Sequence, residues 1–137
     1  MPLFMWKKSY ELKIPEIDMQ HRRLVGLVNE LSDAMMQRAG QRTVPHVLDE
    51  LADYIQLHFS DEEKLMQKIN YPEIENHCQQ HLEFTQQVLD FKERYSQEHE
   101  VDTPGLLNFL CDWLKGHILE NDKEISRFIR RSEMGLG

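Results

Sequence analysis

Seven side chains of types that bind metal ions lie in stretches of this 137-residue sequence whose apolar residues recur at helical spacing. They are five histidines and two carboxylates: His21, His58, Glu62, His77, His81, His117 and Asp122. Donors on four separate helices can meet only inside a bundle, where unpaired polar side chains are costly to bury. A metal centre explains this arrangement most simply. The number of donors indicates two ions rather than one.

Apolar residues recur every three or four positions in four stretches, which predicts four helices of about 20 residues. The expected helices span about residues 18–39, 43–69, 72–97 and 103–131. Asp18 is the expected N-cap of the first helix, and Gly40 is its expected stop. Thr103, which precedes Pro104, is expected to cap the fourth helix.

Residues 1–17 contain two prolines and show no sustained helical period, so we expect them to form an extended arm that packs on the domain. No stretch shows the sustained alternation of a strand. Short turns between helices of similar length predict an all-α, up-down-up-down four-helix bundle in one domain, residues 1–137. In the third helix, we expect Val88 and Leu89 to point inward.

The charge balance limits the partners of the chain. With 24 acidic and 16 basic residues, the net charge of −8 disfavours nucleic acid and anionic membranes, since both require a basic face. No apolar run approaches the roughly 18 residues of a membrane span, and the start of the chain does not resemble a signal peptide. Two cysteines are too few for a disulfide framework. We therefore expect a cytoplasmic protein without membrane insertion, and the lack of an obvious interface stripe favours a monomer.

The spacing of the donors follows the helix in two cases and departs from it in a third. His58 and Glu62, like His77 and His81, are four residues apart and share a helix face. His117 and Asp122 are five apart, which places Asp122 about 140° around a regular α-helix from His117. We therefore predict a local π-type turn that brings Asp122 back to the ligand face.

Each of these motifs is weak by itself, because pairs of histidines and carboxylates are common on solvated helix faces. A single His21 on an apolar face is more often a core histidine than a ligand. The joint pattern is much more specific, because the groups fall on four successive helices among core-facing residues. His46 and His99 lie near helix ends, where we expect ordinary solvated side chains.

The joint pattern resembles the hemerythrins, and most closely the single-domain bacteriohemerythrins. The resemblance covers nearly the whole chain. It is carried by Trp6, Ile17-Asp18-x-Gln20-His21, His58-Phe59-x-x-Glu62-Glu63-x-Leu65-Met66, Tyr71-Pro72, His77-x-x-x-His81-x-x-Phe84 and Trp113-Leu114-x-x-His117-Ile118-x-x-x-Asp122. Every ligand position of the family holds the expected residue type.

This resemblance implies a non-haem di-iron centre. His77, His81 and His117 would hold one iron, and His21 and His58 the other. Glu62, Asp122 and an oxo or hydroxo group would bridge both ions. The second iron then has five donors, and its vacant position is where dioxygen is expected to bind as hydroperoxide.

The function implied is reversible dioxygen storage or transport rather than enzymatic catalysis. The cluster carries the same net charge before and after dioxygen binds as hydroperoxide, so the apolar interior does not oppose the reaction. Leu114, Trp113 and Met66, at about one helical turn from the ligands, are the expected lining of the oxygen pocket. A dioxygen-consuming partner protein is compatible with this role.

Three alternatives remain open at the level of the sequence. Ferritin-like di-iron oxidases use a more carboxylate-rich ligand set, whereas five neutral imidazoles favour binding; peroxide or nitric-oxide scavenging stays open. A sensor of oxygen, redox state or iron usually has an attached output domain, for which 137 residues leave no room. Imidazoles also suit zinc and copper, so the residues alone indicate two ions, and the family resemblance selects iron.

Overall fold

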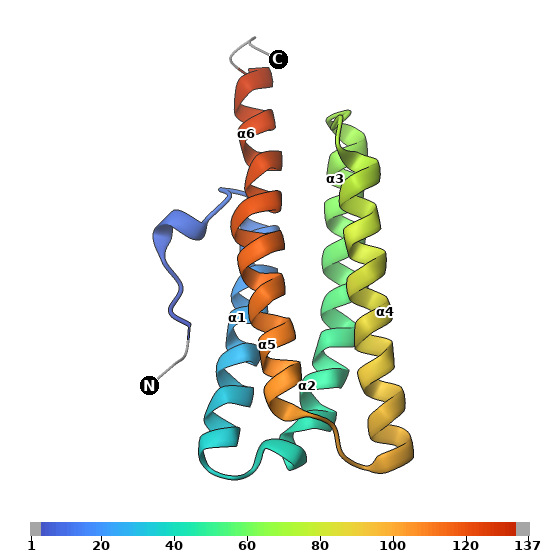
Figure 1. The fold of residues 1–137 in the computed structure, drawn as a ribbon. Coiled ribbons are helices and arrows are strands. Elements are labelled where there is room, and N and C mark those ends of the chain that lie inside the picture. The colour runs from blue at the N-terminus through green and yellow to red at the C-terminus, as the bar shows by residue number, and fades with distance from the viewer. Residues whose placement is uncertain (1–3, 134–137) are drawn as a thin grey trace.

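A computed structural model of the chain describes residues 4–133 and confirms the all-α class. The chain folds as four long helical rods in an up-down-up-down bundle, and the described residues contain no strand (Figure 1). The elements are η1 (Lys8–Tyr10), α1 (Pro15–Met36), α2 (Gly40–Tyr54), η2 (Ile55–Phe59), α3 (Ser60–Lys68), α4 (Ile74–Glu98), α5 (Thr103–Trp113), η3 (Leu114–Asn121) and α6 (Asp122–Glu133). Two rods are interrupted, because η2 and η3 are π-helical segments within otherwise continuous helices.

The first helix begins earlier than Asp18. Pro15 starts α1, since its fixed φ and missing N–H suit the first helical turn. Asp18 therefore lies inside this turn and is not the N-cap; its Oδ1 accepts a hydrogen bond from the Leu12 amide at 2.8 Å. This contact ties the end of the arm to the helix.

The other helix boundaries shift by a few residues from the expected ones. The first helix ends at Met36, and Gly40 opens α2 rather than closing α1. A Cβ at position 40 would lie 3.1 Å from the Met35 side chain, so a glycine suits this tight turn. The N-cap of α5 is Asp102 rather than Thr103, since Asp102 Oδ1 accepts the Gly105 amide hydrogen bond at 2.9 Å.

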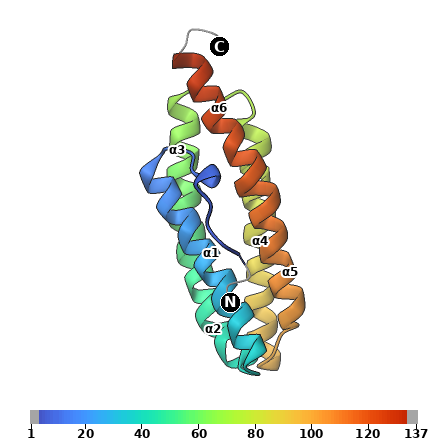
Figure 2. The ribbon, with the colours of Figure 1, turned by 90° about the vertical axis from the view of Figure 1, so that its left-hand side faces the viewer.

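The N-terminal arm lies along the face of the bundle formed by α1 and the α5–α6 rod (Figure 2). Asn29 on α1 holds it twice: its Oδ1 accepts from the Phe4 amide, and its Nδ2 donates to the Phe4 carbonyl, both at 2.7 Å. Ser126 on α6 donates to the Leu12 carbonyl at 3.1 Å. The part of the arm that the structure describes is therefore held near both of its ends, at Phe4 and at Leu12.

Apolar side chains pack in two separate clusters along the bundle. The main cluster contains most of the buried leucines and valines of α1, α2, α4 and α5, and a smaller one contains Met66, Tyr71 and Ile125. Val88 is buried as expected, but Leu89 is 52% exposed, so its predicted inward position is wrong. None of the helices in residues 4–133 combines the length and apolarity needed to cross a membrane.

Candidate metal centre

All seven predicted ligand residues come together in the interior of the bundle. Each is buried, with at most 3% of its surface exposed: His21, His58, Glu62, His77, His81, His117 and Asp122. They project from α1, η2, α3, α4, η3 and the start of α6. Every rod of the bundle therefore contributes to one polar site in the interior.

The irregular spacing of His117 and Asp122 is accommodated as predicted. The π-helical segment η3 ends at Asn121, and Asp122 is fully buried at the start of α6. Its Oδ1 lies 2.9 Å from Nε2 of His117. A wider π turn rotates the next residues back toward the face that a regular α-helix would have left. A second π segment, η2, contains His58 and was not predicted.

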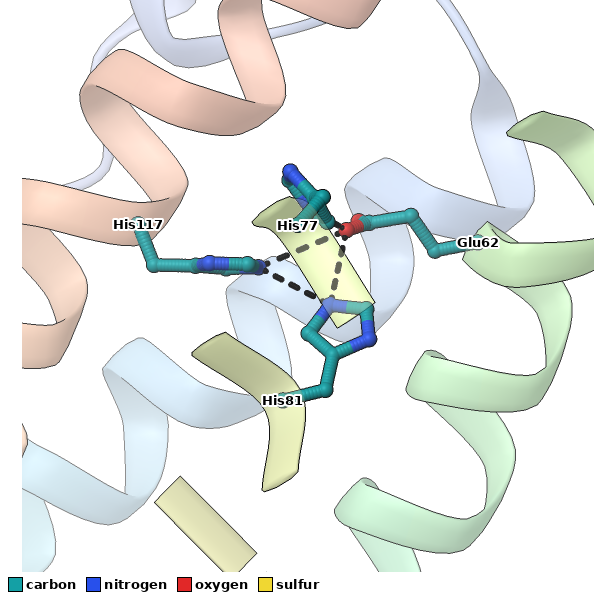
Figure 3. A group of neighbouring side chains, drawn as sticks. All are labelled: Glu62, His77, His81 and His117. Carbon is teal, nitrogen blue, oxygen red and sulfur yellow. Dashed lines mark hydrogen bonds and ion pairs between the residues drawn. The ribbon is translucent and has the colours of Figure 1, made fainter. Parts of the chain in front are cut away.

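The donor atoms form two groups, each with its atoms within 4.8 Å of one another. The first group is Glu62, His77, His81 and His117, which Figure 3 shows converging from three rods. The second group is His21, His58, Glu62 and Asp122. The two groups thus divide the histidines three to two, and Glu62 belongs to both.

Glu62 directs one oxygen to each group of histidines. Its Oε1 lies in contact with Nε2 of His77, 3.1 Å from Nε2 of His81 and 3.3 Å from Nε2 of His117. Its Oε2 lies 3.0 Å from Nε2 of His58. A single carboxylate therefore spans the distance between the groups.

Asp122 also reaches from one group of histidines to the other. Its Oδ1 lies 2.9 Å from Nε2 of both His77 and His117. Its Oδ2 lies 2.8 Å from Nε2 of His21 and 3.6 Å from Nε2 of His58. Each carboxylate thus contacts both groups of histidines, and all five histidines direct Nε2 toward the carboxylates.

Several polar atoms of the centre lack a hydrogen-bonding partner in the described part of the chain. His58 Nε2, Glu62 Oε2 and Asp122 Oδ1 are buried and have no hydrogen-bonding partner of acceptable geometry within residues 4–133. Nε2 of His81 and Nε2 of His117 face each other at 3.3 Å, an arrangement that needs a proton on just one of them. Buried atoms are normally paired, so inward-facing lone pairs that lack donors fit a metal ion better than a hydrogen-bonded core.

The histidines of the centre keep its two carboxyl groups ionised. Burial by itself raises the pKa of Glu62, but His58 and its neighbours hold that pKa well below its ordinary range. Burial and the charge of Glu62 raise the pKa of Asp122, yet His117 and His21 lower it well below its usual value. Both carboxylates are therefore anionic at neutral pH and attract cations.

The same carboxylates act on the histidines. Burial lowers the pKa of His58, but Glu62 and Asp122 more than reverse this effect and raise it to about 10. Burial also lowers the pKa of His77, and the same two carboxylates raise it to about 9. Without a metal ion, protons on these imidazoles balance the buried anions.

Three residues lie within hydrogen-bonding distance of Nδ1, the ring nitrogen that points away from the centre, on three of the histidines. Gln20 Oε1 lies 2.8 Å from Nδ1 of His58, Glu63 Oε2 lies 2.8 Å from Nδ1 of His81, and Gln80 Oε1 lies 3.0 Å from Nδ1 of His117. An acceptor on this side places the proton on Nδ1 and leaves the Nε2 lone pair directed at the centre. Sequence reasoning assigned no role to these residues, because each lies on a different helical rod from its histidine.

The orientation of Gln20 is itself fixed from outside. Its Nε2 donates to Oδ2 of Asp61 at 2.8 Å, so its oxygen, not its nitrogen, faces His58. Gln80 is fixed in a similar way, since Asn121 Nδ2 donates to its Oε1 at 2.7 Å. These contacts give His58 and His117 the tautomer that a metal ion requires.

Three aromatic rings cover one side of the centre, each stacked on an imidazole of one of its histidines. Tyr54 lies on His58, with ring centroids 4.8 Å apart and planes inclined by 12°. The other two stacked pairs are Phe59 on His81, at 3.8 Å and 2°, and Trp113 on His117, at 3.9 Å and 12°. The rings shield the imidazoles from water and restrict their rotation.

The three residues predicted to line the oxygen pocket pack in the two apolar clusters. Leu114 is fully buried in the main apolar cluster, and Trp113 packs against that cluster. Met66 is also fully buried but belongs to the smaller cluster with Tyr71 and Ile125. Met66 therefore packs in a different apolar cluster from Leu114 and Trp113, and a shared oxygen pocket stays a prediction.

The two remaining histidines lie outside the centre, as expected. His46 and His99 are exposed. His46 Nε2 lies 3.2 Å from Oε1 of Glu30 on the surface, and His99 closes α4 in a left-handed conformation with φ of 57°.

The fold and the buried cluster together define a four-helix bundle with a mixed histidine and carboxylate centre suited to metal ions. Residues 12–129 match the family model described as the hemerythrin HHE cation binding domain. The chain therefore belongs to the hemerythrin family.

Comparison with individual proteins agrees with this assignment. The chain is 32% identical to a bacteriohemerythrin of Stenotrophomonas maltophilia, over 98% of this chain and 92% of the relative. It is 31% identical to a bacteriohemerythrin of Clostridium acetobutylicum, over 89% of this chain and 98% of the relative. Its fold matches the crystal structure of a leucine-to-alanine variant of a hemerythrin with a TM-score of 0.80 and 28% identity, over 93% of this chain and 98% of the other.

Proposed function

We propose that the chain binds dioxygen reversibly at a pair of non-haem iron ions. The observation that supports this most directly is the division of five buried histidines into groups of three and two, with both carboxylates reaching each group. His77, His81 and His117 would hold one ion, His21 and His58 the other, with Glu62 and Asp122 between them. The iron pair would supply the electrons that dioxygen takes up and recover them on its release.

The composition of the centre favours binding over further oxygen chemistry. Five neutral imidazoles and two carboxylates place fewer anions on the ions than the carboxylate-rich sets of ferritin-like oxidases. The stacked rings of Tyr54, Phe59 and Trp113, together with buried Leu114, exclude water and external proton donors from this side. Exclusion of proton donors slows the loss of reduced oxygen species and so favours release of intact dioxygen.

The visible spectrum tests this proposal. Iron-loaded, reduced protein is exposed to air and the dissolved oxygen is then removed. An absorption band that appears with air and disappears on removal supports a reversible carrier. A permanent change to an oxidised spectrum contradicts reversible binding and favours an oxidase or a sensor, and a colourless protein that retains zinc rejects the iron assignment.

A second test concerns the apolar side of the centre. Leu114 is fully buried three residues before His117, so Leu114→Ala should open space beside the ligands and speed autoxidation of the oxygenated protein. Leu106→Ala is the matched control, because Leu106 is equally buried on the same rod but more than two turns away from His117. Equal autoxidation rates in the two variants would contradict a gating role for Leu114.

A further inference from the structure

Tyr54 carries a buried hydroxyl that the fold leaves unpaired. The residue is 1% exposed, and its hydroxyl has no hydrogen-bonding partner within residues 4–133. A buried hydroxyl without a partner destabilises the fold, so such groups are rare unless they serve a ligand. The apolar residue phenylalanine would fill the same space without this cost.

The interaction of Tyr54 with Trp113 does not provide a partner for the hydroxyl proton. The Trp113 indole N–H interacts with Tyr54, yet its Nε1 is likewise buried and without a partner of acceptable geometry in the described residues. An indole N–H only donates, so it has no lone pair to accept the hydroxyl proton. The Tyr54 hydroxyl and the Trp113 N–H thus lie on facing rods without a partner of acceptable geometry, and the hydroxyl proton has no acceptor among the described side chains.

Both of these side chains stack on histidines of the proposed metal centre. Tyr54 is stacked on His58 and Trp113 on His117, which belong to the two different groups of donor atoms. Tyr54 is one helical turn before His58 on the α2–η2 rod, and Trp113 one turn before His117 on the α5–η3 rod. The two unpaired donors therefore lie beside the centre, on the side covered by aromatic rings.

We infer that the Tyr54 hydroxyl, with the Trp113 N–H beside it, binds a small hydrogen-bond acceptor at the centre: dioxygen, or a two- or three-atom anion in its place. This inference rests on the proposed function. The near-complete burial of Tyr54 limits the ligand to a few atoms, and the pairing of two donors selects a ligand rich in lone pairs. Tyr54 is thus a residue that determines affinity and selectivity for such ligands, in addition to the metal ligands themselves.

The test compares Tyr54→Phe with the parent and with Tyr95→Phe. Tyr95 lies on α4 against the main apolar cluster, so its variant controls for loss of a tyrosine hydroxyl elsewhere. The probe is azide, titrated into oxidised, iron-loaded protein and followed by visible absorption. Loss of a hydrogen bond to an anion should raise the azide dissociation constant of Tyr54→Phe roughly tenfold to a hundredfold, while Tyr95→Phe binds like the parent.

A second measurement uses the metal-free protein. Because the hydroxyl is unpaired, Tyr54→Phe should unfold at the same temperature as the parent or higher. A lower unfolding temperature would mean that the hydroxyl has a structural partner and would overturn the inference. Unchanged azide affinity in iron-loaded Tyr54→Phe would also overturn the inference, but it would not contradict the proposed metal centre. A parent protein that holds no iron would instead refute the proposed function, and this inference with it.

Discussion

Asp122 Oδ1 lies 2.9 Å from Nε2 of His117 although the two residues are five apart in the sequence. The π-helical segment η3 makes this contact possible, since it widens the helix just before Asp122. The same carboxylate reaches His21 through its other oxygen, at 2.8 Å. One irregular turn therefore joins the last rod of the bundle to both groups of histidines.

Asp122→Asn should reduce the amount of iron that the protein holds. The amide replaces one oxygen by an NH₂ group, which cannot bind a metal ion, and removes a charge that spans both groups. We expect the iron content to fall from the proposed two ions per chain to one or none, as measured by elemental analysis after reconstitution. Asp112→Asn, an exposed change on α5, should retain the parent content. Two ions in Asp122→Asn would contradict a bridging role.

Gln20→Leu should weaken metal binding without removing a ligand. The substitution deletes the acceptor that holds Nδ1 of His58, so the imidazole loses its fixed tautomer and orientation. Loss of such a partner typically costs about tenfold to a hundredfold in metal affinity, which competition with a chelator would measure. Gln97→Leu, on the exposed end of α4, is the control. Equal affinities in the two variants would show that Gln20 has no positioning role.

The parts of this molecule that follow local rules could be predicted from the sequence. The helical period gives four rods, and donors four residues apart on one rod fall on one face. The five-residue interval between His117 and Asp122 does not fit a regular helix, which made the η3 segment predictable. The regular four-residue interval between His58 and Glu62 gave no such indication, so the η2 segment was missed.

Features that depend on contacts between rods could not be predicted. The acceptors of the histidine Nδ1 protons lie on other rods; Gln20, for example, is 38 residues from His58. Asp18 has the chemistry of an N-cap, but Pro15 starts the helix first and the Asp18 carboxylate bonds Leu12 instead. Such choices depend on three-dimensional neighbours and not on residue type.

Asn29→Ala should release the N-terminal arm. The side chain makes both hydrogen bonds to Phe4, and their loss should lower the free energy of unfolding by about 1–3 kcal/mol in urea denaturation. Asn108→Ala, at an exposed site on α5, gains the same helix propensity and so serves as the matched control. Faster proteolysis before residue 15 in Asn29→Ala alone would locate the effect in the arm. Equal stabilities of the two variants would show that this clamp contributes nothing.

Metal loading should release protons. In the metal-free protein, the pKa values of His58 and His77 are raised to about 10 and about 9, so both imidazoles carry a proton at neutral pH. A metal ion binds only the neutral imidazole and must displace these protons. Titration calorimetry in buffers of different ionisation enthalpy should therefore report a net release of protons when Fe²⁺ binds near pH 7.5. Binding heats that do not depend on the buffer would contradict this exchange.

The same pKa values predict how the metal-free protein responds to alkali. Because the folded values of His58 and His77 lie above the ordinary value of 6.5, their contribution to stability is fully present below about pH 6.5 and is lost as the pH rises through about 9 and 10. The metal-free protein should therefore melt at a lower temperature at pH 10.5 than at pH 6.5. Iron-loaded protein should show a smaller decrease, since the ions replace the protons as partners of Glu62 and Asp122. A decrease of equal size in both forms would mean that the metal does not occupy the proton sites of the centre.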